Sequence, residues 1–303
     1  MEPVIEPVES NATTERAPRQ RLREFEVRVT EVIWETADSV TLVFDAGDEP
    51  LDYKAGQFLS LRPQQIEVLK GIAAYFEEAK GKKEPARAYS MTSAPHEPLA
   101  ITIKEELFVS GTTKYPPLLS PFLVWGVRAG MTFKVTGFGG PYALPADIES
   151  ETDHIVHICA GSGIVPNYSI LKDALHRKLS LRHTLIYGNK TWADVIFRDA
   201  LERLAAENPD RLRVVHTLSR EQPTAAMAGD VRHGRVSAEL IGEFCPEPKA
   251  IRVFTCGPAN GPFERKAARE KGEELKPRFL ETTLESLNAV GVPKEHVHRE
   301  SYG

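Results

Sequence analysis

An apolar run that passes directly into a glycine turn constrains this chain more than any other feature. Residues 154–160 read HIVHICA, Gly161-Ser162-Gly163 follows, and residues 168–177 have a helical pattern. A short continuous apolar run is typical of a strand buried on both faces of a parallel sheet. Glycines between such a strand and a helix let backbone N–H groups approach a pyrophosphate, which the helix dipole favours. The motif departs from the six-residue dinucleotide fingerprint, so a simple tight turn remains open as well.

The pattern after this run alternates between strands and helices. Further strands are expected at 184–187, 212–218 and 251–256, with a helix at 195–206. Alternation of this kind predicts a parallel sheet with helices on both faces. We therefore expect a nucleotide-binding α/β domain over residues 149–303.

The N-terminal half has a different rhythm. Short alternating strands at 25–29, 40–44 and 56–61 predict a small antiparallel β-barrel within residues 24–148. Residues 1–23 are rich in Glu, Pro, Thr and Arg and predict a flexible tail. In the barrel, we expect residues 99–103 to form a hairpin with the strand that opens at Arg87. A turn cluster at 137–142 is expected to close the barrel.

One segment interrupts the barrel pattern. Apolar residues recur at helical intervals from Ile66 to Phe76, which predicts an inserted amphipathic helix at about 64–84. Two interpretations stay open for it: a helix that covers the barrel, and a lid or docking surface for a partner.

Composition narrows the class of protein. A chain of 303 residues is long enough for two domains, and a net charge of -5 with a pI near 6.0 argues against a nucleic-acid binder. The spacing of Cys159, Cys245 and Cys256 fits neither a zinc site, nor an iron–sulfur cluster, nor a disulfide framework, so we expect a reducing, cytoplasmic setting. The scattered histidines predict no metal site. No signal-peptide core or membrane-length apolar run is present in the sequence.

Two more turns follow strands of the α/β half. Cys256-Gly257-Pro258 closes one strand and Ser219-Arg220 closes another. The carboxyl ends of parallel strands meet at one sheet edge, so both turns are expected beside Gly161. Arg220 with the Ser219 hydroxyl could hold a 2′-phosphate, and Lys190 could add charge. A buried, merely apolar Cys256 and a solvated Arg220 are the alternatives.

The segment Arg87-Ala88-Tyr89-Ser90 carries a cation, an aromatic ring and a hydroxyl. In an extended strand, Arg87 and Tyr89 share one face and Ser90 turns to the other. Such a segment can grip a phosphate and stack on a flat ring. Downstream, Ser120 before Pro121 predicts a helix N-cap.

In this order, the motifs resemble the ferredoxin–NADP reductase superfamily over residues from about 24 to 303. The chain looks most like the reductase components of bacterial oxygenases, of the phenylacetyl-CoA epoxidase and ketosteroid hydroxylase kind, without a ferredoxin domain. Three runs support that subgroup: 187–191, 218–221 and 291–293. The resemblance implies an FAD-binding β-barrel followed by a Rossmann-like domain. It also implies an oxidoreductase that takes hydride from NADPH or NADH and passes single electrons to a ferredoxin or oxygenase component.

The resemblance also implies roles for individual residues at the flavin. Arg87 would bind a flavin phosphate, Tyr89 would stack on the ring, and Ser90 would hydrogen-bond near N5. Ser120 would meet the pyrophosphate. Tyr302 would cover the other flavin face, with a frayed chain end as the alternative.

Other roles belong to the nucleotide side. Glu300 would assist hydride or proton movement, and Cys256 would lie near the nicotinamide. The remaining nucleotide-binding residues would be Gly161, Ser162, Gly163, Lys190, Ser219, Arg220 and Gly257. The basic residues favour NADPH over NADH.

The sequence departs from the family in three places. The inserted segment from Ile66 to Glu84 is unusual and falls next to the strand expected at the flavin. Ser162 stands where the family usually has threonine, and no carrier domain follows, so electrons leave to a separate protein or the carrier lies outside this sequence. Two other functions stay open: a reductase of free flavin or a metal chelate, and a non-catalytic flavin protein that relays electrons within a complex.

Overall fold

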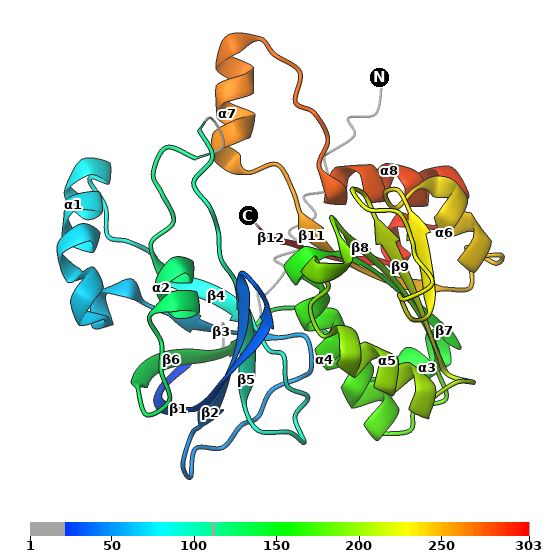
Figure 1. The fold of residues 1–303 in the computed structure, drawn as a ribbon, viewed down its shortest axis with the longest axis horizontal. Helices are drawn as coiled ribbons and strands as arrows, with labels where there is room; N and C mark the ends of the chain where they lie inside the picture. Colours follow the sequence, from blue (N-terminus) through cyan, green and yellow to red (C-terminus); the bar gives the residue numbers. More distant parts are fainter. Residues whose placement is uncertain (1–21, 111–112, 303) are drawn as a thin grey trace, which may run out of the picture.

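The structure is a computed structural model that describes residues 22–110 and 113–302. Its strands form two six-stranded sheets, one antiparallel and one parallel, with most helices around the parallel sheet (Figure 1). The predicted fold class is therefore confirmed. The tail predicted over residues 1–23 falls outside the described residues, except for its last two.

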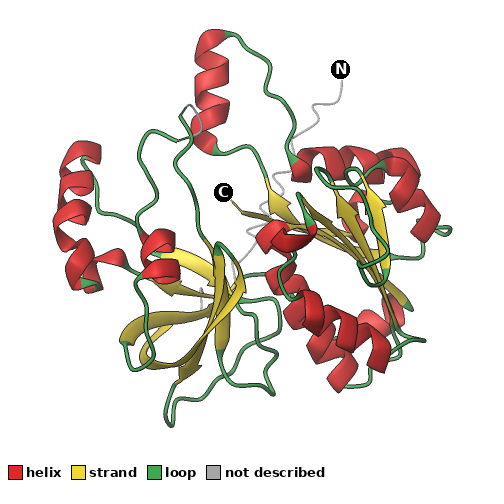
Figure 2. Ribbon diagram, viewed as in Figure 1, coloured by secondary structure: helices red, strands yellow, loops and turns green. Residues whose placement is uncertain are grey.

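The antiparallel sheet curls into a barrel with the strand order β4-β3-β6-β1-β2-β5 (Figure 2). A bridge between Met91 and Ile101 joins the two ends of this order. Alternate side chains of β1, at Phe25, Val27 and Val29, are buried in the barrel core. The strands are β1 (Arg23–Thr36), β2 (Ser39–Asp45), β3 (Phe58–Leu61), β4 (Arg87–Ser90), β5 (Ala100–Lys104) and β6 (Thr132–Gly139).

Two predictions about the barrel were wrong in part. β4 pairs with β3 and β5 pairs with β2, so β4 and β5 are not a hairpin. The two segments meet just beyond β4, at the antiparallel bridge of Met91 with Ile101 and at the hydrogen bonds that the amides of Thr92 and Ser93 donate to the Ala100 carbonyl. The expected turn cluster at 137–142 is also wrong in part, because residues 137–139 continue β6: Gly137 pairs with both β1 and β3, and Gly139 pairs with β3.

The helix expected within residues 64–84 is present as α1 (Lys70–Lys80), after two short 3₁₀ turns. Ala73 and Phe76 are buried, whereas Ile72 and Tyr75 remain exposed. The predicted cap at Ser120 is wrong. Helix α2 (Leu119–Trp125) already includes Ser120, and its N-cap residue is Leu118.

The parallel sheet has the order β10-β9-β8-β7-β11-β12. Helices α4 and α5 pack on one face and α6 and α8 on the other, while α7 stands away from the sheet (Figure 1). The strands are β7 (His154–Ala160), β8 (Arg182–Asn189), β9 (Leu212–Leu218), β10 (Asp230–His233), β11 (Arg252–Pro258) and β12 (Val297–Tyr302). The helices are α3 (Ile148–Glu151), α4 (Ile164–His176), α5 (Arg198–Glu207), α6 (Ala238–Phe244), α7 (Pro262–Lys271) and α8 (Phe279–Val290).

Two helices begin at other residues than predicted. Helix α4 begins at Ile164 rather than at residue 168, because the glycine turn winds directly into it as a 3₁₀ turn. Helix α5 begins at Arg198 rather than at residue 195. Its N-cap residue, Phe197, has a positive φ of 60°, which interrupts the helical path before it.

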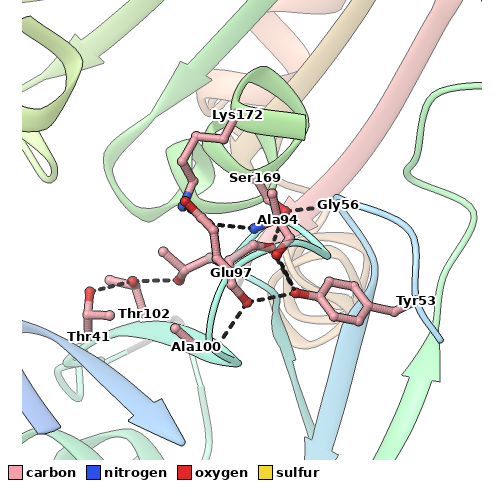
Figure 3. Close-up of polar contacts among 11 residues, drawn as sticks. Thr41, Tyr53, Gly56, Ala94, Glu97, Ala100, Thr102, Ser169 and Lys172 are labelled. Carbon is pink, nitrogen blue, oxygen red and sulfur yellow. Dashed lines mark hydrogen bonds and ion pairs between the residues drawn. The ribbon is translucent and has the colours of Figure 1, made fainter. Parts of the chain in front are cut away.

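Polar contacts join the barrel to the parallel-sheet domain (Figure 3). The Ser169 hydroxyl of α4 donates a hydrogen bond of 2.7 Å to the carbonyl of Ser93, and the amide of Gly56 donates to Ser169 at 3.4 Å. Lys172 of α4 forms an ion pair with Glu97 of the barrel. A Cβ on Gly56 would lie 2.1 Å from the carbonyl oxygen of Tyr142, so glycine permits this close approach.

Within the described part of the chain, no helix has the length and apolar character needed to cross a membrane. The same residues contain no group of three or more His, Cys, Asp or Glu side chains that could hold a metal ion.

Candidate functional site

The glycine turn lies between the centre of the parallel sheet and helix α4. Gly161 has a positive φ of 53°, a conformation that glycine adopts without strain. A Cβ on Gly163 would lie 2.1 Å from the carbonyl oxygen of Cys256, so only glycine lets α4 begin against β11. The Tyr187 hydroxyl donates to the Gly161 carbonyl at 2.9 Å. Contacts with β8 and β11 thus hold the turn in place.

A cavity of about 710 Å³ opens at the carboxyl ends of β7, β8, β9 and β11. Strand β7 has β8 on one side and β11 on the other, which makes this edge the point where the strand order reverses. Ligands of open parallel sheets bind at such points. Five residues predicted from the sequence line the cavity together: Gly161, Ser162, Lys190, Ser219 and Arg220.

The charges in this cavity suit a phosphate ligand. Lys190, Arg220 and Arg235 line it, and none of the three makes an ion pair with another described residue. Thr217 lies at its base, and the Thr217 hydroxyl is buried without a hydrogen-bond partner in the described part of the chain. A buried polar atom without a partner is costly, so a ligand that hydrogen-bonds this hydroxyl is favoured. These residues fit a nucleotide.

The second predicted turn lies beside the first. A Cβ on Gly257 would lie 2.4 Å from the Phe279 ring, which packs over this glycine and lines the cavity. Cys256 is fully buried, and burial, with a smaller contribution from Glu300, raises the pKa of its thiol well above the usual value. The thiol is therefore a protonated, packed group rather than a nucleophile.

Three predicted residues meet where the two domains touch. The Tyr302 hydroxyl donates to the Ser90 hydroxyl oxygen at 2.6 Å, and the Ser90 hydroxyl donates to Glu300 at 3.2 Å. Ser90 belongs to β4 of the barrel, while Glu300 and Tyr302 belong to β12 and pair with Cys256 and Pro258 of β11. Burial raises the pKa of Glu300 from 4.5 to about 7, although the Ser90 hydrogen bond opposes the shift. Glu300 can therefore gain or lose a proton near neutral pH.

The remaining residues of β4 offer an open surface. The Arg87 side chain is 55% exposed, and its nearest carboxylate, Glu84, is 3.9 Å away. Tyr89 is partly exposed although it packs against the barrel core. A phosphate can reach Arg87, and a flat ring can lie against Tyr89 beside Ser90. These residues fit a dinucleotide with a planar ring system.

Ser120 lies in a different environment from the one predicted. It is buried within α2, and its hydroxyl oxygen accepts a hydrogen bond of 3.2 Å from the amide of Glu106. The hydroxyl therefore holds the loop after β5. A contact between Ser120 and a cofactor stays a prediction.

The sequence reasoning missed several residues that line the cavity. Arg235 follows a glycine after β10, and Asn260, Lys276 and Arg278 come from the segment around α7. The dense run of Lys and Arg between 262 and 278 was the available signal. No spacing rule connects that run to the sheet edge, because the chain travels out along α7 and back before it reaches the cavity.

The barrel, the parallel sheet and the paired glycine turns define a ferredoxin reductase-like protein with an NAD-binding domain. Residues 157–266 match the family model described as an oxidoreductase NAD-binding domain. The resemblance predicted from the motifs is therefore confirmed for a ferredoxin reductase-like NAD-binding domain over residues 157–266.

Among curated proteins, the chain is 32% identical over 283 residues to the ferredoxin reductase component of 3-ketosteroid-9-alpha-monooxygenase from Mycolicibacterium smegmatis, covering 91% of this chain and 65% of that protein. It is 27% identical over 282 residues to a component of 1,2-phenylacetyl-CoA epoxidase from Escherichia coli, covering 90% of this chain and 66% of the relative. The chain thus spans somewhat less than two thirds of these relatives. Among solved structures, the FAD/NAD-binding domain of nitric oxide dioxygenase from Vibrio cholerae superposes with a TM-score of 0.68 at 22% identity, covering 93% of this chain and 100% of that one.

Proposed function

We propose that this protein is an FAD-dependent NAD(P)H oxidoreductase that passes single electrons to a separate protein, a ferredoxin or an oxygenase component. The contact of Ser90 with Glu300 and Tyr302 carries the proposal. It joins the strand that can hold a ring system to the strand pair that borders the nucleotide cavity. Curated relatives described as ferredoxin reductase components of a monooxygenase support the kind of acceptor.

Residues of both domains would hold FAD. Arg87 would pair with a phosphate through charge-assisted hydrogen bonds, and Tyr89 and Tyr302 would flank the ring. When bound, the flavin supplies the exchange between a hydride pair and single electrons. The protein positions the ring and excludes water from its reactive edge, where Ser90 and Cys256 are buried.

The cavity would hold the nicotinamide nucleotide. The backbone amides at Gly161 and Ser162 lie where α4 begins, so they and the helix dipole favour a pyrophosphate. Lys190, Ser219 and Arg220 would bind the 2′-phosphate, which favours NADPH over NADH.

Glu300 would accept and release a proton at this edge of the parallel sheet. Its carboxyl group, with a pKa of about 7, accepts a hydrogen bond from Ser90 and can carry a proton at neutral pH. The Ser90 hydroxyl then acts as donor or acceptor toward a neighbouring ring nitrogen, according to the charge on Glu300.

The test is anaerobic rapid mixing of the FAD-loaded protein with NADPH and then with NADH, followed by the absorbance of oxidised flavin. Fast bleaching supports the proposal, and the faster nucleotide decides the role of Ser219 and Arg220. A flavin-loaded protein that neither nucleotide bleaches contradicts the proposal and favours a relay protein. Brisk turnover with free flavin or a ferric chelate, and none with a ferredoxin, favours the free-flavin or chelate reductase.

A cytoplasmic location is proposed on separate grounds. Cys159, Cys245 and Cys256 are all buried free thiols. Unpaired buried cysteines are typical of a reducing compartment. Fractionation of the native host, with immunodetection of the protein, tests this location.

A further inference from the structure

The segment from Asn260 to Arg278, here called the arm, departs from the rest of the fold. It leaves the end of β11, runs outward as α7 and returns to α8 (Figure 1). Within α7, Ala268 is the single buried residue. A helix of ten residues without a packed face is marginally stable in water. The position of the arm therefore depends on how its base is held.

One carboxylate binds both ends of the arm at its base. Glu281 of α8 accepts hydrogen bonds from the amide of Asn260 at 2.9 Å and from the amide of Arg278 at 3.1 Å. The Asn260 side chain also donates to the carbonyl of Lys276 at 3.1 Å. The guanidinium of Arg278 pairs with Glu264 at 2.7 Å. These contacts hold the outgoing and returning segments of the arm together at the sheet edge.

Both ends of the arm form part of the nucleotide cavity. Asn260, Lys276 and Arg278 line the cavity together with Lys190 and the other basic residues of the sheet edge. The charge of Arg278 is compensated by Glu264. Lys276 is exposed, and its amine makes no ion pair within the part of the chain that the structure describes. Of the two cations of the arm that line the cavity, Lys276 is thus the one whose charge can still neutralise a ligand.

We propose that the arm completes the nucleotide site, with the Lys276 amine bound to a phosphate of the pyridine dinucleotide and Glu281 as a positioning residue. The proposal rests on the proposed function, because it names further residues of the same site. The phosphate belongs to the pyrophosphate or is the 2′-phosphate; both offer the same anionic oxygens to a lysine.

The first experiment compares Lys276→Ala with Lys266→Ala, a lysine of the same arm that does not line the cavity. Calorimetric titration of the FAD-loaded proteins with NADP⁺ and NAD⁺ gives dissociation constants that need no catalytic turnover. We expect Lys276→Ala to weaken binding about tenfold, as for one lost charge-assisted hydrogen bond, and Lys266→Ala to leave it unchanged. Weakening for NADP⁺ alone assigns the 2′-phosphate, and weakening for both assigns the pyrophosphate.

Equal affinities of Lys276→Ala and Lys266→Ala for both nucleotides overturn the proposal. If the wild-type protein binds nucleotides but does not reduce its flavin, the proposed function fails while the role of Lys276 stands. If wild type binds neither nucleotide, both fail.

The positioning role of Glu281 has its own test. Glu281→Ala should weaken binding of the same nucleotide as Lys276→Ala, and the double variant should lose little more than either single variant, because both act through one contact. Glu281→Gln keeps one acceptor oxygen and should recover part of the affinity. Fully additive losses in the double variant contradict the positioning role.

Discussion

At the residue scale, Ser90 links the two domains. Its hydroxyl accepts from Tyr302 and donates to Glu300, so each partner constrains the other two. Ser90 precedes Glu300 and Tyr302 by more than two hundred positions, and the resemblance alone implied separate roles for the three at the cofactors. The geometry joins the three side chains by two hydrogen bonds, along which the proposed function would move a proton.

Replacing Ser90 tests this pathway. Ser90→Ala removes the donor to Glu300 and the acceptor for Tyr302, and we expect flavin reduction to slow by about 10²-fold with little loss of bound FAD. Anaerobic rapid mixing with NADPH measures the rate, and Ser60→Ala on the neighbouring strand β3 is the control. An unchanged rate removes Ser90 from the mechanism.

The pKa of Glu300 gives a second prediction. Since burial raises it from 4.5 to about 7, we expect the flavin reduction rate to titrate near pH 7 in wild type and to be flat there in Glu300→Gln. A wild-type profile without a transition near pH 7 contradicts this role.

The raised pKa of Glu300 also makes the unfolding free energy depend on pH. Between pH 4.5 and about 7, the folded state binds the Glu300 proton more tightly than the unfolded state does. Its stabilising contribution is therefore complete below pH 4.5 and is lost as pH rises to about 7. The unfolding free energy of Glu300→Gln, measured in urea, should rise relative to wild type by roughly 3 kcal/mol over this range.

At the element scale, the turn from β7 into α4 decides where the site lies. The apolar run and the glycines predicted both elements, and the structure adds the reason for the second glycine. Gly163 is needed for contact with β11, an element some ninety residues away, rather than for a positive φ. Local turn chemistry predicts Gly161 but not Gly163.

Gly163→Ala tests that close approach. The added methyl group would meet the Cys256 carbonyl, so we expect a loss of about 3 kcal/mol in unfolding free energy and weaker nucleotide binding. Gly71→Ala in α1 is the matched control, because its Cβ meets open space and alanine favours a helix by about 1 kcal/mol. Chemical denaturation measures both, and equal stability of the two variants contradicts the packing role of Gly163.

At the scale of the whole molecule, the site exists only because the two domains are held together. Ser169 and Lys172 of α4 reach polar groups of the barrel (Figure 3). The rings of Tyr142 and Phe254 also meet edge to face, with their centroids 5.4 Å apart. Burial lowers the pKa of Lys172 although Glu97 opposes the shift. The ion pair is therefore partly desolvated and more consequential than a surface pair.

Lys172→Met tests whether this ion pair couples the unfolding of the two domains. It leaves Glu97 without its cation, and we expect the unfolding free energy to fall by about 2 kcal/mol and the domains to unfold in separated calorimetric transitions. Arg182→Met, which breaks the exposed pair with Asp153, should cost less than about 1 kcal/mol. Equal effects of the two variants would show that the interface pair does not couple the domains.

The sequence by itself determined the two kinds of sheet, the glycine turn, and Lys190 and Arg220 of the cavity, because strand periodicity and turn chemistry are local. It misplaced the partner of β4 and the cap at Ser120, since barrel closure and the loop after β5 decide those contacts. The tertiary structure alone brought Lys276 to the cavity and Ser90 to Glu300. Such contacts depend on the path of the chain between distant elements, and no local preference encodes that path.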